Sequence, residues 1–305
     1  MKIKSLLFSI CLMVCSQAYA FTPKNNPITV IIPFAPGGGV DQTFRHFEVW
    51  ANKKGYNFVA QFKPGADGLI GMDTIASSPK DGYTVSFGTA GTVATQRLKN
   101  PNAELIVVTA IRTSITGFVT SVKSNIKSLD ELDSRLRSKD GVSIGVGAPG
   151  QSIVIDQIIE LSKTQEKQTI VNYKGGNPVV VDLVGGHIDL AGVPLNIVSR
   201  HIESNKVKLI GVTSDKRLDQ YPTVPIINEK YLGYKNLDGI LFILPSKVDK
   251  SVVDFYTNLL KEYLNDPTVT KDFVKDYYHA LPFGQQYAEQ LIDSTKNRLS
   301  KIVKQ

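Results

Sequence analysis

Cysteine is almost absent from this chain. Its two cysteines, Cys11 and Cys15, both lie within the first 20 residues, so the rest of the 305-residue chain has none. A chain of this kind has no disulfide framework, no thiolate nucleophile and no cysteine metal site beyond residue 20.

The spacings typical of catalytic and metal sites are also missing. The sequence has no H-E-x-x-H, no EF-hand loop and no G-x-S-x-G elbow. Its four histidines have no recognisable nucleophile or orienting acid nearby in sequence: His46, His187, His201 and His279. We therefore expect no catalytic residue, no metal and no cofactor, and we interpret the histidines as surface or core residues. A triad assembled only in three dimensions stays open.

Long apolar runs and blocks of one charge are lacking as well. After residue 20 no segment approaches the roughly 20 apolar residues that span a bilayer. Lysine and arginine number 35 against 28 acidic residues, for a formal net charge of +7, and they are spread along the chain. Without a basic block interleaved with aromatic residues, we do not expect nucleic acid as a partner, whereas a small anionic ligand suits this balance.

The first 20 residues have the pattern of a secretory signal. Two lysines precede an apolar run, Leu6–Cys15, and Ala18-Tyr19-Ala20 matches an A-x-A cleavage site. We expect cleavage near Ala20/Phe21 and export of the mature chain to the periplasm, without insertion into the membrane. Val14 stands where a lipoprotein signal needs a small residue, which argues against a lipid anchor on Cys15.

A glycine-rich bend follows the first predicted strand. Ile28–Ile32 is a β-branched apolar run typical of a buried strand, and two prolines and Gly37–Gly39 come directly after it. We expect Asp41 to cap a helix whose first apolar positions are Phe44, Phe47, Val49 and Trp50. A strand, a bare glycine loop and a helix N-terminus form an anion site, and a plain turn is an equally open interpretation. The loop matches neither a Walker sequence nor a dinucleotide fingerprint.

Strand and helix patterns alternate along most of the chain. We expect strands at 28–32, 56–62, 84–88, 142–146, 169–171, 188–190, 208–213 and 239–244, with helices at 128–139, 151–164, 178–184, 195–204, 250–264, 267–277 and 285–304. The β-rich segment 104–122 is interpreted as a crossing between domains. The sequence thus predicts an α/β fold of two domains, each a mainly parallel sheet flanked by helices. We place domain 1 at 21–120 and 225–305 and domain 2 at 121–224, with a ligand cleft at the carboxyl ends of the strands.

A second glycine motif, Gly145–Gly150, is a literal G-x-G-x-x-G between a predicted strand and helix. Export from the cytoplasm, the missing N–H of Pro149 and the position in the second domain all disfavour a dinucleotide. We prefer a second helix N-terminus, with Gln151 and Ser152 as further hydrogen-bond donors.

These segments together resemble the Bug family, also called TctC-like proteins, the periplasmic solute-binding components of tripartite tricarboxylate transporters. The resemblance covers nearly the whole mature chain. It rests on Ile31–Gly38 with Asp41 and Arg45, Pro64-Gly65-Ala66 with Gly68 and Gly71, Pro79 with Asp81–Thr84, Tyr173–Gly176, Asp182-Leu183 with Gly185-Gly186, and Thr213-Ser214 with Arg217, Pro222–Pro225 and Glu229.

The resemblance implies a monomeric two-domain periplasmic binding protein (type II) that closes on a small organic carboxylate like a flytrap and delivers it to membrane transporter subunits. It also implies a ligand site. The expected ligand-binding residues are Phe34, Ala35, Pro36, Gly37, Gly38 and Asp41 in the first loop, Gly88, Thr89 and Ala90 after the third strand, and Gly147, Ala148, Gly150, Gln151, Ser152 and Pro194 in the second domain.

Three departures from the family pattern lie near this site. Ala148-Pro149-Gly150 replaces the usual serines, Leu190-Ala191-Gly192 replaces a Phe-Asp-like pair, and Lys63 stands where Asn or Arg is typical. The identity of the carboxylate therefore does not carry over, and whether Lys63 and Lys174 contact it stays open. Two alternatives to a transport receptor also remain at this point: a ligand sensor for a receptor kinase and a secreted enzyme using the same cleft.

Overall fold

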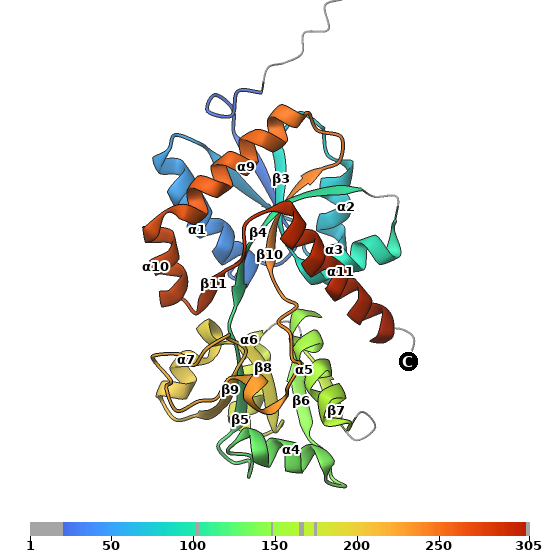
Figure 1. Cartoon of the computed structure of the whole chain (residues 1–305), viewed down its shortest axis with the longest axis vertical. Coiled ribbons are helices and arrows are strands. Elements are labelled where there is room, and N and C mark those ends of the chain that lie inside the picture. The colour runs from blue at the N-terminus through green and yellow to red at the C-terminus, as the bar shows by residue number, and fades with distance from the viewer. Residues whose placement is uncertain (1–20, 102–103, 148, 165–167, 174–175, 303–305) are drawn as a thin grey trace, which may run out of the picture.

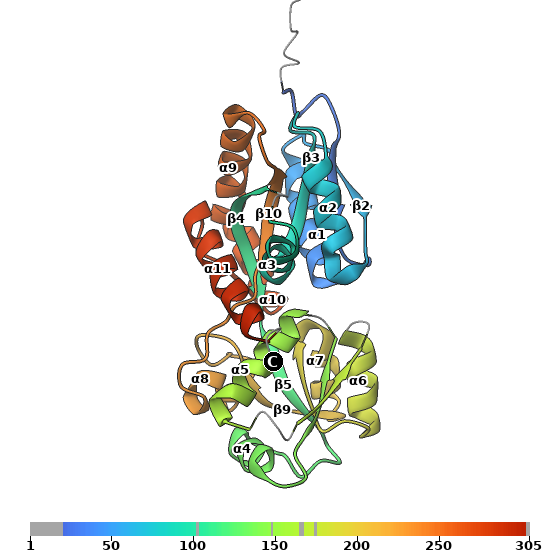
Figure 2. The ribbon, with the colours of Figure 1, turned by 90° about the vertical axis from the view of Figure 1, so that its right-hand side faces the viewer.

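In a computed structural model the chain forms two α/β units stacked end to end, each built around its own sheet (Figures 1 and 2). The structure describes residues 21–101, 104–147, 149–164, 168–173 and 176–302. The expected signal at 1–20 lies outside these residues. The elements are β1 (Ile28–Ile32), α1 (Gly39–Lys53), β2 (Phe58–Phe62), η1 (Ala66–Gly68), α2 (Leu69–Ser77), β3 (Thr84–Thr89), α3 (Ala90–Lys99), β4 (Leu105–Ser114), β5 (Thr116–Ser121), α4 (Leu129–Arg137), β6 (Ser143–Val146), α5 (Pro149–Ser162), β7 (Thr169–Asn172), α6 (Gly176–Gly185), β8 (Leu190–Pro194), α7 (Leu195–Glu203), β9 (Val207–Val212), α8 (Ile227–Lys230), β10 (Ile240–Pro245), α9 (Lys250–Asn265), α10 (Pro267–Lys275), β11 (Tyr278–Ala280) and α11 (Gln285–Ile302).

The first sheet has the order β11-β4-β10-β3-β1-β2. Strands β1 to β4 run in one direction, whereas β10 and β11 run against them. The central strand β10 is buried on both faces: Ile240, Phe242 and Leu244 join one apolar cluster, and Leu241 and Ile243 join another. Successive side chains of a strand point to opposite faces, so this continuous apolar run holds helices α1, α9 and α10 on one face and α2, α3 and α11 on the other.

The second sheet has the order β7-β6-β8-β5-β9, in which only β5 runs against its neighbours. Helices α4, α5 and α8 cover one face and α6 and α7 the other. Both units are thus mixed sheets flanked by helices, which confirms the predicted α/β fold of two units. The sheets were expected to be mainly parallel, but three of the five strand pairs in the first sheet and two of the four in the second are antiparallel.

The chain passes between the sheets without a long linker. Ser114 ends β4 in the first sheet and Thr116 begins β5 in the second, so the crossing lies at Ile115. On the return, Ile226 still pairs with Val212 of β9, and Tyr231 and Tyr234 pack in the apolar cluster of the second unit.

The boundaries expected at 120/121 and 224/225 therefore fall within segments that belong to the second sheet or its core. We propose instead that the second domain runs from about Ile115 to Asn236. The pattern of polar and apolar residues in 104–122 does not locate the crossing between the sheets, because β4 and β5 are both buried strands.

Most predicted elements are present, with shifts of one to four residues. Helices α3 and α8, the short helix η1 and strand β11 were not predicted, and the strand expected at 188–190 begins only at Leu190. Of the apolar positions named for α1, Val49 does not face the core, because 58% of its surface is exposed. It follows Phe47 by two residues, and that spacing turns a helical side chain away from the buried stripe.

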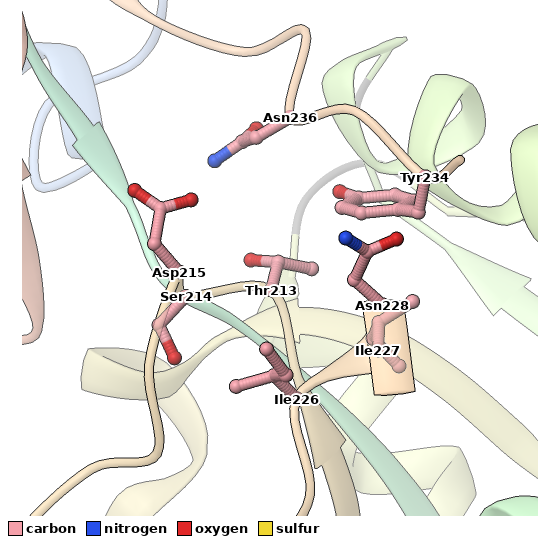
Figure 3. Close-up of a pocket in the computed structure, with 8 residues that line it drawn as sticks. All are labelled: Thr213, Ser214, Asp215, Ile226, Ile227, Asn228, Tyr234 and Asn236. Atoms are coloured by element: carbon pink, nitrogen blue, oxygen red, sulfur yellow. The ribbon is translucent and has the colours of Figure 1, made fainter. Parts of the chain in front are cut away.

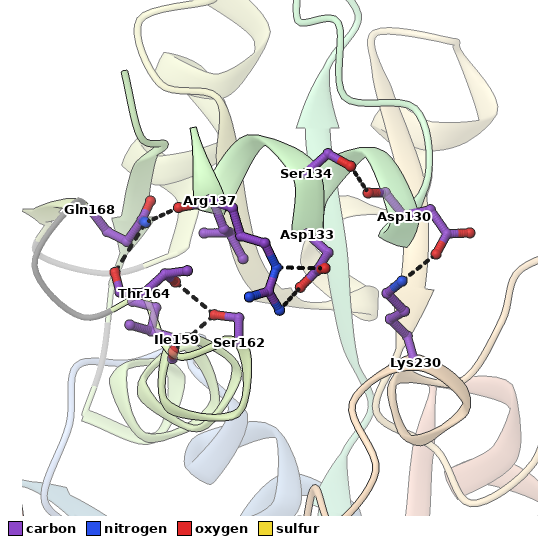
Figure 4. Close-up of polar contacts among 10 residues, drawn as sticks. Asp130, Asp133, Ser134, Arg137, Ile159, Ser162, Thr164, Gln168 and Lys230 are labelled. Atoms are coloured by element: carbon purple, nitrogen blue, oxygen red, sulfur yellow. Dashed lines mark hydrogen bonds and ion pairs between the residues drawn. The ribbon is translucent and has the colours of Figure 1, made fainter. Parts of the chain in front are cut away.

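Polar contacts fix the helices at the end of the second unit that lies farthest from the first (Figure 4). Gln168 donates through Nε2 to the Leu136 carbonyl of α4 at 2.8 Å, and the Ser162 and Thr164 hydroxyls lie 2.7 Å apart where α5 ends. Lys230 of α8 pairs with Asp130 at the start of α4. Gln168 thus satisfies a carbonyl in the last turn of α4, and the ion pair ties α8 to the start of the same helix.

Candidate functional site

The glycine loop joins β1 to α1 with a left-handed residue at Gly37, whose φ is +83°. Helix α1 starts at Gly39 with Gly38 in the N-cap position, so the expectation that Asp41 caps the helix is wrong. Asp41 instead lies in the first turn, 7% exposed, and its Oδ2 accepts a hydrogen bond from the Gly37 N–H at 2.8 Å. The left-handed backbone at Gly37 suits glycine, and the Asp41 carboxylate closes the loop from inside the helix.

This bond changes which backbone donors are available. The N–H of Gly37 is engaged by Asp41, and the first helical bond runs from the Gln42 N–H to the Gly38 carbonyl at 2.9 Å. The N–H groups between these two positions point out of the helix start and are the donors that a carboxylate can reach. Of the predicted loop residues, Ala35, Pro36 and Gly37 are exposed and Phe34 and Gly38 are half-buried.

The turn from β3 to α3 lies beside this loop, because β3 pairs with β1 in parallel and both strands end at the same edge. Thr89 caps α3 by accepting from the Thr92 N–H at 3.0 Å, and the Ala90 N–H donates to the Gly239 carbonyl at 2.9 Å. Gly88 is buried inside β3, where an added Cβ would lie 2.9 Å from Ile243 Cδ1. Gly88 and Ala90 are thus placed to shape this edge rather than to donate to a ligand.

In the second unit, β6 and β8 also end side by side. Gln151 is buried in the first turn of α5 and accepts from the Gly147 N–H through Oε1 at 2.6 Å, while Ser152 is half-buried. Pro194 occupies the N-cap position of α7. The predicted residue Ala148 lies outside the described residues.

The G-x-G-x-x-G motif does not form a phosphate loop. Gly145 is inside β6, and a Cβ there would lie 2.5 Å from Ile188 Cδ1 and 2.8 Å from Val179 Cγ1. This glycine makes room for the packing of α6. The first glycine of the motif, where a pyrophosphate site needs a tight turn, therefore lies inside a strand. The spacing of the glycines alone is misleading for this reason.

Asp238, which the sequence did not single out, lies against the start of α5. Its Cγ is 3.3 Å from the position of a Cβ on Gly150, and its Oδ1 accepts from the Gly239 N–H at 2.9 Å. Burial raises the pKa of this carboxyl group. The side chain of Asp238 thus places a carboxyl group beside the N-terminus of α5.

Direct contacts join the two strand edges. Asn196, near the start of α7, donates through Nδ2 to Gln42 Oε1 of α1 at 2.8 Å and to the Tyr278 hydroxyl at 3.3 Å. The Tyr278 hydroxyl itself donates to Gln42 Oε1 at 3.1 Å, and Gln42 Nε2 donates to the Gly37 carbonyl at 3.1 Å. These four groups link the glycine loop to the second unit. Sequence reasoning missed Gln42, Asn196 and Tyr278, although Gln42 adjoins Asp41 and Asn196 follows Pro194 by two residues.

Two cavities of the described structure lie away from this strand-edge site. One, of about 90 Å³, lies where the chain returns from β9 and is lined by Thr213, Ser214, Asp215, Ile226, Ile227, Asn228, Tyr234 and Asn236 (Figure 3). The other, of about 510 Å³, lies beside Lys123, Ser134 and Arg135 in the second unit. Neither includes a predicted ligand-binding residue, so the strand-edge site rests on the converging loops and the contacts between them.

Lys63 is half-buried directly after β2, and its backbone N–H donates to the Ile32 carbonyl at 2.8 Å. Lys174 lies outside the described residues. Within the described ranges, three or more His, Cys, Asp and Glu side chains are nowhere grouped as metal ligands. None of the described helices combines the length and apolar character needed to cross a bilayer.

Known proteins resemble this chain in sequence and in fold. The model of the tripartite tricarboxylate transporter family receptor matches residues 45–305, a segment that starts inside α1, just after the glycine loop. BugT of Bordetella pertussis is 28% identical over 275 residues, which cover 85% of this chain and 83% of BugT.

Solved structures show the same fold. The periplasmic binding protein BugD superposes with a TM-score of 0.73 at 25% identity, covering 90% of this chain and 94% of BugD. R. palustris Rpa4515 with adipate superposes with a TM-score of 0.79 at 22% identity, covering 91% and 96%. The family model describes a transporter family receptor, and its match covers most of the chain. The chain belongs to the tripartite tricarboxylate transporter receptor family, as its resemblance to Bug proteins predicted.

Proposed function

We propose that this protein is a periplasmic receptor that captures a small organic carboxylate between its two units and delivers it to a membrane transporter of the tripartite tricarboxylate type. One carboxylate group of the solute binds the N–H groups at the start of α1, and the loops of β3, β6 and β8 enclose the rest. The observation that carries this proposal is the convergence of the strand ends of both units, joined by the hydrogen bond between Gln42 and Asn196. A chain of this family with adipate provides the chemical precedent.

Closure around the ligand follows from the same contacts. The chain crosses between the sheets at only a few residues, which is the arrangement of a hinge, and the Gln42–Asn196 bond forms only when the two edges meet. A carboxylate at the glycine loop lies beside this bond and favours the closed form by contacting both units.

A thermal-shift screen of the chain from Phe21 onward tests the proposal. The compounds are adipate, malate, citrate, aromatic acids, acidic amino acids and nicotinate, with NAD as a control. A ligand at about one hundred times its dissociation constant stabilises the fold by about 2.7 kcal/mol, or roughly 4–5 °C in a chain of this size. We expect a response to at least one carboxylate and none to NAD. A response to NAD alone would contradict the proposal and favour a dinucleotide site at Gly145–Gly150.

Transport is tested separately from binding. Uptake of the labelled hit is measured in cells that express the small and large membrane subunits of such a transporter, with and without this receptor. We expect receptor-dependent uptake, which is lost in an Asn196→Leu variant that cannot join the two units. Binding without receptor-dependent uptake would favour a role in sensing.

A further inference from the structure

The side chain of Arg112 is fully buried in the first unit and has no counter-ion among the described residues. Its exposed fraction is 0%, and its Nη1 and Nη2 have no hydrogen-bond acceptor among the described residues. None of the ion pairs of the described chain includes it. A buried guanidinium without a carboxylate is rare, because removing the charge from water costs a large hydration free energy. Burial accordingly lowers the pKa of Arg112. Arginine nevertheless keeps its charge in proteins.

Its surroundings hold the charge only weakly. The guanidinium carbon lies 3.5 Å from the ring centroid of Tyr278 and 4.8 Å from that of Phe273, and Nε donates to Thr43 Oγ1 at 2.8 Å. Aromatic faces attract a cation but do not neutralise it. Asp276 acts on Arg112 through space, but its own carboxylate is 43% exposed and is engaged by His46 at 2.9 Å.

Arg112 lies beneath the start of α1. Thr43, its hydrogen-bond acceptor, donates in turn to the Gly39 carbonyl at 2.7 Å, and the Tyr278 hydroxyl lies 3.6 Å from the position of a Cβ on Gly39. The same hydroxyl bonds to Gln42 and Asn196 where the two units meet. The unpaired cation is therefore connected to the glycine loop both through the first turn of the helix and through the ring that stacks on it.

We infer that Arg112 is the fixed counter-charge for the ligand carboxylate held at the glycine loop, and that it acts through space from behind Tyr278 without touching the ligand. The inference rests on the proposed function and assigns a residue that sets the affinity for anions. In the empty protein the charge is uncompensated, and an ionised carboxylate at the start of α1 supplies the missing partner. The receptor thus selects a carboxylate over its neutral amide by more than the helix N-terminus alone would allow.

The test compares an acid with its own amide. Dissociation constants for adipate and for its neutral diamide, or for whichever carboxylate the thermal-shift screen identifies and its amide, are measured by calorimetry on wild type, Arg112→Met and Arg112→Gln. Two unit charges about 10 Å apart at an effective dielectric constant of about 20 correspond to a roughly tenfold to twentyfold change in affinity. We expect each neutral variant to bind the acid about tenfold more weakly and the amide as wild type does, while Arg112→Lys keeps most of the preference.

Stability supplies a second readout with the opposite sign. Replacing a buried, unpaired charge with an apolar side chain of similar size is often neutral or stabilising, so unliganded Arg112→Met should melt at the same temperature as wild type or higher. Arg97→Met is the matched control, because Arg97 pairs with Glu289 on the other face of the same sheet and should leave the acid-to-amide ratio unchanged. In wild type, the affinity for the acid should change less than about threefold between 0.05 and 0.5 M salt, since a buried charge is weakly screened.

Equal losses for acid and amide would show that Arg112 only supports the structure, and unchanged binding of the acid would also overturn the inference. If neither neutral variant folds, the salt dependence of the wild type decides. A severalfold loss of its affinity for the acid in high salt would overturn the inference, because such a loss would assign the attraction to exposed lysines. A wild-type protein that responds to no carboxylate at all would instead refute the proposed function. The two failures are thereby distinguished.

Discussion

A single added charge at Gly38 should separate ligand binding from folding. Gly38 is the N-cap residue of α1, with φ −76° and ψ 172°, which any residue adopts. A Cβ there would meet only the Ala35 carbonyl, at 3.6 Å, an ordinary contact. Gly38→Asp and Gly38→Asn are therefore isosteric variants that both fold, and that differ only in the charge they place where the ligand carboxylate is expected.

The two variants should have nearly the same stability. Asn or Asp at an N-cap is better than glycine by a few tenths of a kcal/mol, and repulsion between a carboxylate at 38 and Asp41 offsets the favourable helix dipole in the Asp variant. We expect both to unfold within about 1 kcal/mol of wild type in urea.

Binding should differ sharply. A carboxylate about 5 Å from the ligand carboxylate repels it by about 1–3 kcal/mol for effective dielectric constants between about 80 and 20. Calorimetry should therefore show about 5- to 150-fold weaker binding to Gly38→Asp than to Gly38→Asn. Equal affinities of the two variants for the same acid would refute the assignment of the carboxylate to the start of α1.

Three further outcomes are expected. Thr89→Ala and Ser128→Ala each remove a side chain that caps a helix, α3 and α4 respectively, and each should lower the free energy of unfolding by about 1 kcal/mol. Only Thr89→Ala should also weaken ligand binding. Equal effects of the two variants on binding would contradict the proposed site. Tyr231→Phe removes a buried hydroxyl that has no hydrogen-bond partner among the described residues. The free energy of unfolding in urea should stay unchanged or rise by up to about 1 kcal/mol, and a clear loss would show that the hydroxyl has a partner. Burial lowers the pKa of His279 below its usual 6.5, so its contribution to stability is present above pH 6.5 and is lost as the pH falls through the folded-state pKa; urea unfolding of His279→Gln should show a shallower loss between pH 7 and 5, and an unchanged pH profile would contradict this.

Local sequence patterns predicted much of the fold because they act over a few residues. The β-branched run Ile28–Ile32 became β1 with the predicted bounds, and Ser128 caps α4 by accepting from the Glu131 N–H at 3.1 Å. Where the expectation failed, a long-range contact prevailed over the local pattern. Strand β11 is only three residues long and exists because Tyr278 pairs with Ser114, which is far away in sequence.

For the candidate site, local sequence was enough to predict a strand, a glycine loop and a helix start, which we interpret as an anion site, because glycine conformations and helix termini depend on neighbouring residues. Only the tertiary structure decided which side chains surround that loop. It placed Asp238 against Gly150, and beneath α1 it left Arg112 without a counter-ion among the described residues. These pairings join residues up to 88 positions apart in case of Asp238 and Gly150 and more than 60 for Arg112 and Thr43. Spacing along the chain does not encode them, because the burial of a charge and its partners are set by how the helices pack on the sheet.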